Sequence, residues 1–278
     1  MDVSVADQWK SNGYVVVRKV LDVAQTVRLR RVCDGVLEQW RRRDPQTQRP
    51  GDPNARVMRH LNHPAYFAGG TPGLGDIFEL AAHPTLLDLA RTLLGEEPMF
   101  RCTSYFINPL ETSTDGDWHR DSQYETPDEA SERALLLRGG DTGAGVQLQV
   151  ALVPSDDVEI VAGSHLRYDT PEEYAIRLAD GTTHNRSNLM PDATRVSLAA
   201  GDAAAFNSLA VHRGRYHKDK LRRTIMLTYT KSSRPTCDYF SNQPWFLNPA
   251  YRARIPPAAE ALFAAFIATY AEFWQRGA

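Results

Sequence analysis

Residues 201–212, Gly-Asp-Ala-Ala-Ala-Phe-Asn-Ser-Leu-Ala-Val-His, contain the pattern that decides the fold of this 278-residue chain. Gly201 and Asp202 are turn residues, the small and apolar residues after them fit a short buried strand, and the stretch ends in His212. Other short β-rich runs lie on both sides, separated by turn residues. The expected strands are 100–108, 146–153, 158–161, 194–198, 203–206 and 224–230. This spacing is typical of an antiparallel jelly roll or barrel.

Helical patterns flank these strands. After a short expected strand at 13–17, Asp22 fits an N-cap, Pro84 begins a leucine-rich helix that Gly95 ends, and residues 256–257 open a closing helix. We therefore expect one domain over 1–278, mainly β with flanking helices. Residues 1–98 are predicted to be a mostly helical support, 99–235 the jelly-roll core, and 236–278 a C-terminal helical extension.

The composition excludes several classes of protein. A formal net charge of −2 argues against nucleic acid as the main partner, because no general positive field is available to neutralise phosphates. No apolar stretch approaches the length of a membrane span, and the first residues carry acids where a signal peptide needs basic ones. Three widely spaced cysteines fit reduced thiols. These features predict a cytoplasmic protein, and none of them predicts its oligomeric state.

The tripeptide His119-Arg120-Asp121 is the strongest chemical signal. In an extended segment, residues i and i+2 project to the same side, so His119 and Asp121 could bind one metal ion while Arg120 points away. A second histidine from a distant strand would complete the two-histidine, one-carboxylate face of non-haem iron(II) oxygenases. The tripeptide alone is weak evidence, because short His-x-Asp motifs occur by chance.

Arg223 follows His212 by eleven positions and opens the expected strand 224–230. A guanidinium there could form a bidentate pair with the far carboxylate of a dicarboxylate cosubstrate. The alternative is a surface arginine beside Arg222, in a run that also contains Lys218 and Lys220. On the residues alone, the surface arginine is the favoured interpretation.

Several motifs taken together resemble one known family. They are residues 118–121 (Trp-His-Arg-Asp), 162–165 (Ala-Gly-Ser-His), the Gly-Asp pair ahead of His212, and the interval from His212 to Arg223. In this order they resemble the phytanoyl-CoA dioxygenase-like (PhyH) family of Fe(II)/2-oxoglutarate-dependent oxygenases. Ala162 departs from the proline usual before Gly-Ser-His, and Gly214 stands where relatives often have a hydroxyl residue.

The resemblance implies a double-stranded β-helix, which is a cupin-like jelly roll. It also implies Fe(II) bound by His119, Asp121 and His212, and 2-oxoglutarate anchored by Arg223, with O2 as the oxidant. Tyr105 falls where family members line the cosubstrate pocket. His165 in the Gly-Ser-His segment is expected to pack near the site or hold a turn, not to bind metal.

The implied activity is hydroxylation of a small-molecule metabolite, with release of succinate and CO2, and we expect a tailoring step in specialised metabolism. Asp121 disfavours halogenation, because related halogenating enzymes have a small residue at that position. The same iron chemistry could instead give desaturation, cyclisation or epimerisation. A different class, a non-catalytic jelly-roll protein that binds a small ligand, stays open.

Candidate substrate residues come from strand alternation and aromatic content. Gln147 and Gln149 share one face of a strand and could contact the substrate or 2-oxoglutarate, or simply bond within the fold. Tyr229 has the parity of Arg223 and could line the same pocket, and Trp118 and Trp245 are further aromatic candidates. The charged segments 41–59 and 126–145 could close over the substrate. The arginines of 41–59 could contact an anionic substrate, but a solvated charged loop is the favoured interpretation.

Overall fold

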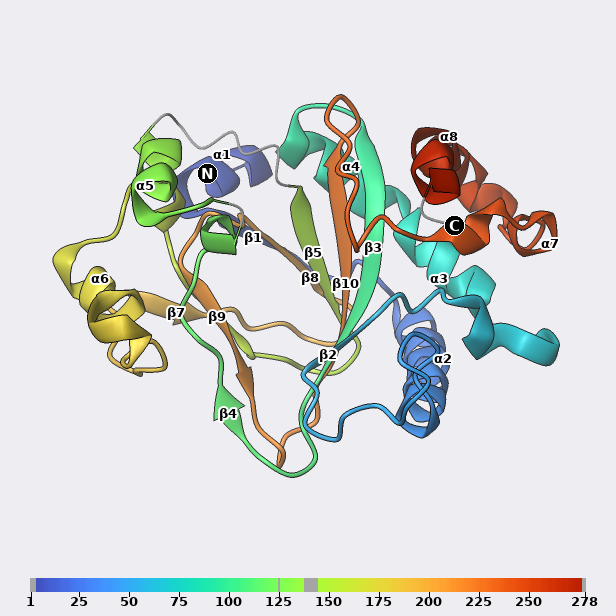
Figure 1. Ribbon diagram of the computed structural model, residues 1–278, viewed down its shortest axis with the longest axis horizontal. Coiled ribbons are helices and arrows are strands. Elements are labelled where there is room, and N and C mark those ends of the chain that lie inside the picture. Colours follow the sequence, from blue (N-terminus) through green and yellow to red (C-terminus); the bar gives the residue numbers. More distant parts are fainter. Residues whose placement is uncertain (1–3, 125, 138–144, 277–278) are drawn as a thin grey trace.

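Two antiparallel sheets face each other in the structure, a computed structural model that describes residues 4–124, 126–137 and 145–276 (Figure 1). The larger sheet has the order β1 (Tyr14–Val17), β8 (Ala203–Phe206), β5 (Val146–Ala151), β10 (Arg223–Lys231), β3 (Pro98–Ile107) and β2 (Val57–Arg59). The smaller sheet has the order β4 (Thr114–Asp115), β9 (His212–Tyr216), β6 (Val158–Val161) and β7 (Ala193–Arg195). This arrangement confirms the predicted jelly-roll core.

Each of the six strands predicted at the core overlaps an observed strand, and the strand predicted at 13–17 is β1. Strands β2, β4 and β9 were not predicted. The N-terminal segment contributes more than helical support, because β1 and β2 form the two edges of the large sheet. Strand β1 pairs with β8, and β2 pairs with β3.

Helices hold more of the described residues than strands do, so "mainly β" describes the core better than the whole chain. The α-helices are α1 (Val5–Asn12), α2 (Val23–Arg42), α3 (Leu74–Ala81), α4 (Pro84–Leu94), α5 (Glu129–Leu137), α6 (Pro171–Arg177), α7 (Pro249–Arg252) and α8 (Glu260–Arg276). Short 3-10 helices are η1 (Pro64–Gly70), η2 (Asp121–Tyr124), η3 (Ser164–Leu166), η4 (Ala179–Thr182), η5 (Pro244–Leu247) and η6 (Pro257–Ala259).

The ends of two helices follow from local chemistry. The Asp22 side chain accepts from the backbone N–H of Gln25, whose side chain accepts from the Asp22 N–H, so a capping box begins α2. Pro84 occupies the first turn of α4, where its missing N–H costs nothing. Gly95 ends that helix at φ 72°, a left-handed conformation that glycine adopts without strain.

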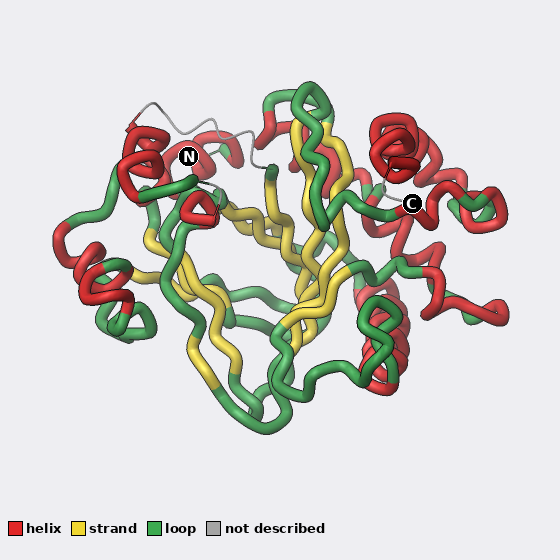
Figure 2. Tube along the Cα trace, in the orientation of Figure 1, coloured by secondary structure: helices red, strands yellow, loops and turns green. Residues whose placement is uncertain are grey.

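The large sheet has two unlike faces (Figures 1 and 2). Helices α2, α3, α4 and α8 lie beyond its outer face, while α5 and α6 lie on the side of the small sheet. On β10, Ile225, Leu227 and Tyr229 point to the helices and are fully buried. The alternating residues Met226 and Thr228 point the other way and line a cavity between the sheets. The functional residues must therefore be sought on the inner face.

The two segments predicted to close over the substrate are partly regular. Residues 41–59 include the end of α2 and strand β2, and residues 126–145 include α5. Residues 138–144 of the second segment lie outside the described part of the chain. No helix in the described ranges is long and apolar enough to cross a membrane.

Candidate active site

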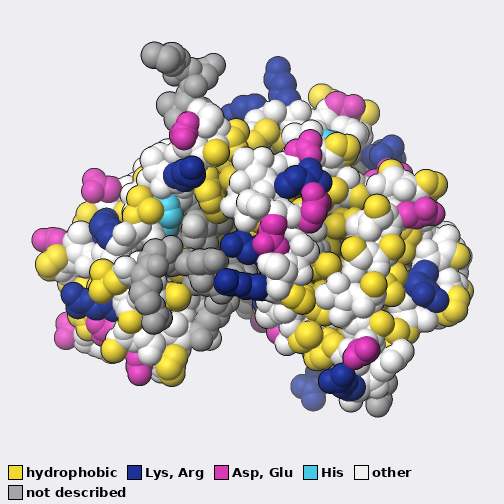
Figure 3. All heavy atoms as spheres, turned by 90° about the horizontal axis from the view of Figure 1, so that it is seen from above, with side chains coloured by type: hydrophobic (Ala, Val, Ile, Leu, Met, Phe, Trp, Pro, Cys, Tyr) yellow, Lys and Arg dark blue, Asp and Glu magenta, His cyan; other side chains and the backbone are white. Residues whose placement is uncertain are grey.

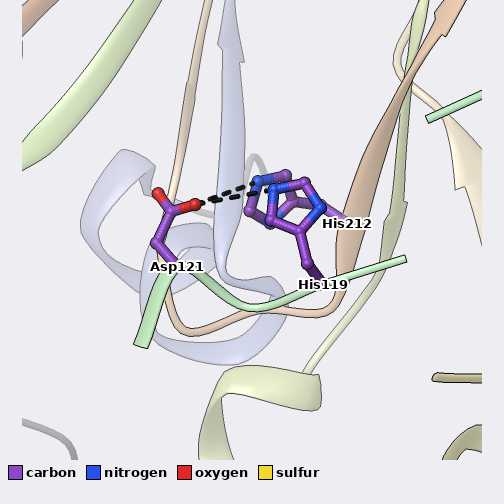
Figure 4. A group of neighbouring side chains, drawn as sticks. All are labelled: His119, Asp121 and His212. Atoms are coloured by element: carbon purple, nitrogen blue, oxygen red, sulfur yellow. Dashed lines mark ion pairs between the residues drawn. The ribbon is translucent and has the colours of Figure 1, made fainter. Parts of the chain in front are cut away.

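Strand pairing brings the three predicted metal ligands together. His119 forms an isolated bridge with His212 at the start of β9, with N···O distances of 3.0 and 2.9 Å. Asp121 begins η2, and its N–H donates to the Ser208 carbonyl at 2.8 Å. The Asp121 Oδ1 atom lies 3.6 Å from His119 Nε2 and 3.8 Å from His212 Nε2 (Figure 4). One ion bonded at about 2.1 Å to each atom spans such distances.

Backbone carbonyls orient both imidazoles. His119 Nδ1 donates to the Asp117 carbonyl at 2.7 Å, and His212 Nδ1 donates to the Ala210 carbonyl at 2.9 Å. The proton on each Nδ1 leaves the lone pair on Nε2, which faces Asp121. Burial, and then the neighbouring His119, lower the pKa of His212 to about 4. His212 is therefore neutral at pH 7, as a metal ligand must be.

A glutamine on the inner face of β5 orients the carboxylate. Gln147 Nε2 donates to Asp121 Oδ2 at 2.6 Å, so the other oxygen, Oδ1, remains directed at the two histidines. Such a partner behind a metal ligand fixes the geometry of that ligand. Gln149 lies on the same face of β5, and both glutamines line the cavity.

The cavity between the sheets has a volume of about 620 Å³ and contains the three ligand residues. Its wall combines arginines with aromatic side chains. The arginines are Arg56, Arg59, Arg101, Arg213 and Arg222, and the aromatic residues are Phe106, Tyr124, Phe206, Tyr216 and Phe240. A cavity of this size suits a small organic molecule with polar groups.

Arg222, and not Arg223, reaches this cavity. The Arg222 side chain is 1% exposed, and its guanidinium carbon lies 5.0 Å from the ring centres of Phe106 and Tyr216. Its Nη1 donates to the Arg215 carbonyl at 3.4 Å. Its Nε makes no hydrogen bond with the described residues and lies 3.8 Å from Asp157. A buried guanidinium with an unused donor is suited to a carboxylate ligand.

The expected placement of Arg223 and Tyr105 is corrected. Arg223 has the parity of the helix-facing residues of β10, and its Nε donates to Asp34 of α2. The Tyr105 hydroxyl donates to the same Asp34 carboxylate at 3.3 Å. Both side chains thus lie in the layer between sheet and helices, because alternation along β10 and β3 turns them away from the cavity.

Three other aromatic candidates also lie outside the cavity wall. The Tyr229 hydroxyl donates to the Ala81 carbonyl at 2.6 Å on the helix side. Trp118 is buried, donates to the Ser187 carbonyl at 2.8 Å, and stacks under Arg213. Trp245 packs against the rings of His60 and His63. Of the residues predicted to contact substrate, the structure brings only Gln147 and Gln149 to the metal ligands.

Two motif residues have local packing explanations. His165 Nε2 lies 3.2 Å from the Lys10 carbonyl, and its ring packs on Gly13, away from the three ligands. A Cβ atom at Gly214 would lie 2.4 Å from the Tyr216 hydroxyl oxygen. The tyrosine hydroxyl thus occupies the space that a hydroxyl side chain at position 214 would need.

Strand alternation was the signal that could have identified the missed residues. Arg222 shares its parity with Met226 and Thr228, and Arg59 shares its parity with Val57, all of which line the cavity. Phe240 and Asp238 lie in the segment after β10, where no periodicity predicts their position.

Two histidines and a carboxylate that face one point, inside a jelly-roll cavity with a buried arginine, define an Fe(II)- and 2-oxoglutarate-dependent oxygenase. The family model for phytanoyl-CoA dioxygenase (PhyH) matches residues 9–224. The chain belongs to this family, as the sequence motifs predicted. It is an oxidoreductase of the iron and 2-oxoglutarate class.

Solved structures with a similar fold include enzymes with varied reactions. The epimerase SnoN, in complex with Fe3+, alpha ketoglutarate and nogalamycin RO, has 21% identity and a TM-score of 0.57, over 86% of this chain and 88% of that chain. EctD from S. alaskensis, with 2-oxoglutarate and 5-hydroxyectoine, has 18% identity and a TM-score of 0.56, over 88% and 82%. The carbocyclase SnoK from nogalamycin biosynthesis has 19% identity and a TM-score of 0.55, over 84% and 85%. A search of curated proteins found no match.

Proposed function

We propose that this enzyme binds Fe(II) through His119, Asp121 and His212, binds 2-oxoglutarate through Arg222, and oxidises a C–H bond of a small molecule. The observation that carries the proposal is the convergence of the three ligand atoms within 4.8 Å of one another in the cavity that Arg222 lines. Bound iron and 2-oxoglutarate supply an oxidant from O2, with release of succinate and CO2.

The chain itself supplies position and protonation state. The Nδ1 hydrogen bonds hold both imidazoles with Nε2 toward Asp121, and Gln147 holds the carboxylate. This leaves one side of the ligand set open to the cavity, where cosubstrate, oxygen and substrate can meet. The aromatic residues of the wall would exclude water from a bound substrate and hold one of its C–H bonds near the iron site.

Arg222 is assigned to the far carboxylate of 2-oxoglutarate for two reasons. Its planar guanidinium is held between Phe106 and Tyr216, so its donors have a fixed direction. Its side chain is buried, and the nearest carboxylate, Asp157, is already bonded by Lys220 at 2.9 Å and by Ser155 at 2.8 Å. A dianionic cosubstrate would satisfy this buried charge.

Hydroxylation of a specialised metabolite is the outcome we propose first. With iron bound, Asp121 would occupy the coordination position that a halide needs in related halogenating enzymes, which favours oxygen insertion over halogenation. Desaturation, cyclisation and epimerisation use the same ligand set, and the relatives SnoN and SnoK are described as an epimerase and a carbocyclase. The mass of the product separates these outcomes, because hydroxylation adds one oxygen, desaturation or cyclisation removes two hydrogens, and epimerisation changes nothing.

The deciding experiment is an anaerobic titration of the metal-free protein with Fe(II) and 2-oxoglutarate. We expect the visible charge-transfer band of the iron chelate in the wild type and its loss in His119→Ala. A wild type without the band, or a variant that keeps it, would overturn the site assignment. Succinate release in air, screened against small metabolites, then identifies the substrate.

A further inference from the structure

One wall of the cavity is an alternating series of arginines and aromatic rings. Arg101 and Arg59 each lie 4.9 Å from the ring centre of Phe240, and Arg59 lies 6.0 Å from that of Phe106. The series continues through Arg222 to Tyr216. Contact with a ring fixes the direction in which a guanidinium presents its N–H donors.

The charges of this wall are unequally neutralised. Arg101 pairs with Asp238, and Arg213 pairs with Glu159 at 2.5 Å. Arg222 is assigned to 2-oxoglutarate, and Arg56 is exposed to solvent. Arg59 is half-buried in the wall, and no carboxylate in the described ranges lies within ion-pair distance of it. Its Nη1 donates to the Ser104 hydroxyl at 2.8 Å, which leaves its charge uncompensated.

Positive charge is a local property of this cavity. The net charge of the whole chain is −2, and the face seen from above in Figure 3 mixes acidic and basic side chains. In the cavity wall, five arginines stand against Asp121 and Asp238. Since Asp121 is assigned to the metal and Asp238 is bonded to Arg101, the wall attracts an anion.

We propose that Arg59 binds an anionic group of the organic substrate, a carboxylate or a phosphate, while Phe106 and Phe240 contact the apolar body next to that group. This substrate class rests on the proposed function, because it places the substrate in the iron cavity. Arg59 lies on the edge strand β2, whereas Gln147, on β5, contacts the metal ligand Asp121. An anion on Arg59 therefore leaves the rest of the molecule to extend across the cavity toward the iron.

The test compares matched acid and neutral probes. Phenylacetate is compared with phenylacetamide, and phenyl phosphate with phenol, by calorimetric titration of the wild type loaded anaerobically with Fe(II) and saturating 2-oxoglutarate. We expect the preferred acid to bind at least about tenfold more tightly than its neutral partner. The better of the two acids distinguishes a carboxylate substrate from a phosphorylated one. Equal binding of acid and neutral probe in both pairs would overturn the proposal.

Variants then assign the preference to one side chain. Arg59→Gln should abolish the preference and leave the Fe(II)–2-oxoglutarate band unchanged, and Arg59→Lys should keep the charge but lose several-fold in affinity. Arg31→Gln is the matched control, because Arg31 is exposed on α2 outside the cavity. If Arg59→Gln keeps the full preference for the acid probe, the proposal is contradicted. If Arg59→Gln does not fold, an undiminished acid preference in Arg59→Lys contradicts it instead.

Two variants distinguish a failure of this inference from a failure of the proposed function. Arg222→Gln should weaken 2-oxoglutarate binding and leave the acid preference in place, whereas Arg59→Gln should do the reverse. An absent iron band in the wild type overturns the proposed function alone. The acid preference and its dependence on Arg59 are then read from titrations of the metal-free protein.

Discussion

The two faces of the large sheet are made by the same strands but have opposite characters. On the outer face of β10, Ile225, Leu227 and Tyr229 are fully buried under helices, and the charged Arg223 is paired with Asp34. On the inner face, Met226 and Thr228 border a cavity, and the buried Arg222 keeps an unused donor.

This difference separates stability from chemistry along a single strand. On the outer face, the apolar side chains are packed against helices and Arg223 is paired with Asp34, so these residues stabilise the fold. On the inner side, the cavity is unfilled by side chains, and Arg222 has a donor that no group of the described residues accepts. Substitutions at adjacent positions should therefore affect different properties, which can be measured separately.

The largest effect is expected at the metal ligands on the inner side. Asp121→Ala should abolish the Fe(II)–2-oxoglutarate band and lower succinate production at least about 1000-fold, equivalent to about 4 kcal/mol, because two imidazoles alone hold the ion poorly. Asp117→Ala is the matched control, since the Asp117 side chain pairs with Arg186 and contributes only its backbone carbonyl to the site. Equal loss in both variants would mean that the carboxylate is not a ligand.

On the outer face, Leu227→Ala should lower the free energy of unfolding by about 2–5 kcal/mol, because it leaves a void in a fully buried position. Its neighbour Met226 already borders the cavity, so Met226→Ala should cost less than about 2 kcal/mol. Urea denaturation measures both values, and the 2-oxoglutarate affinity of Leu227→Ala should stay unchanged. A larger cost at Met226 would reverse the assignment of the two faces.

The adjacent arginines give the sharpest comparison of the faces. Arg222→Gln should raise the Kd for 2-oxoglutarate about 10- to 100-fold, because a charge-assisted pair with the carboxylate is lost. Arg223→Gln should leave that Kd unchanged and weaken only the contact with Asp34. Anaerobic titration by the iron band measures both. The opposite ranking would return the anchor to Arg223.

The smallest effect is expected behind the carboxylate. Gln147→Ala should weaken Fe(II) binding about tenfold, because Asp121 loses the hydrogen bond that orients it. Gln149→Ala, on the same face of β5 without that contact, should bind Fe(II) as the wild type does. Competition with a colorimetric chelator measures both affinities, and equal values would show that the hydrogen bond has no influence on the metal.

The sequence was sufficient for the family, the jelly-roll core and the convergence of His119, Asp121 and His212, because these depend on motifs and on strands with clear apolar content. It predicted correctly that Tyr229 and Arg223 share one face of β10. It did not identify which face of β10 lines the cavity. A shift of one residue in the turn before the strand moves each side chain to the opposite face, so the sequence could not decide whether Arg222 or Arg223 points inward. Strand β9 was missed because His-Arg-Gly-Arg-Tyr has no apolar alternation.

The close approach of Gly214 and Tyr216 has a consequence for how this site can change over evolutionary time. A serine at position 214 would displace a tyrosine ring that stacks against Arg56 and Arg222, and would thereby disturb the proposed cosubstrate anchor. A smaller residue at 216 would make room for a larger side chain at 214 without this displacement.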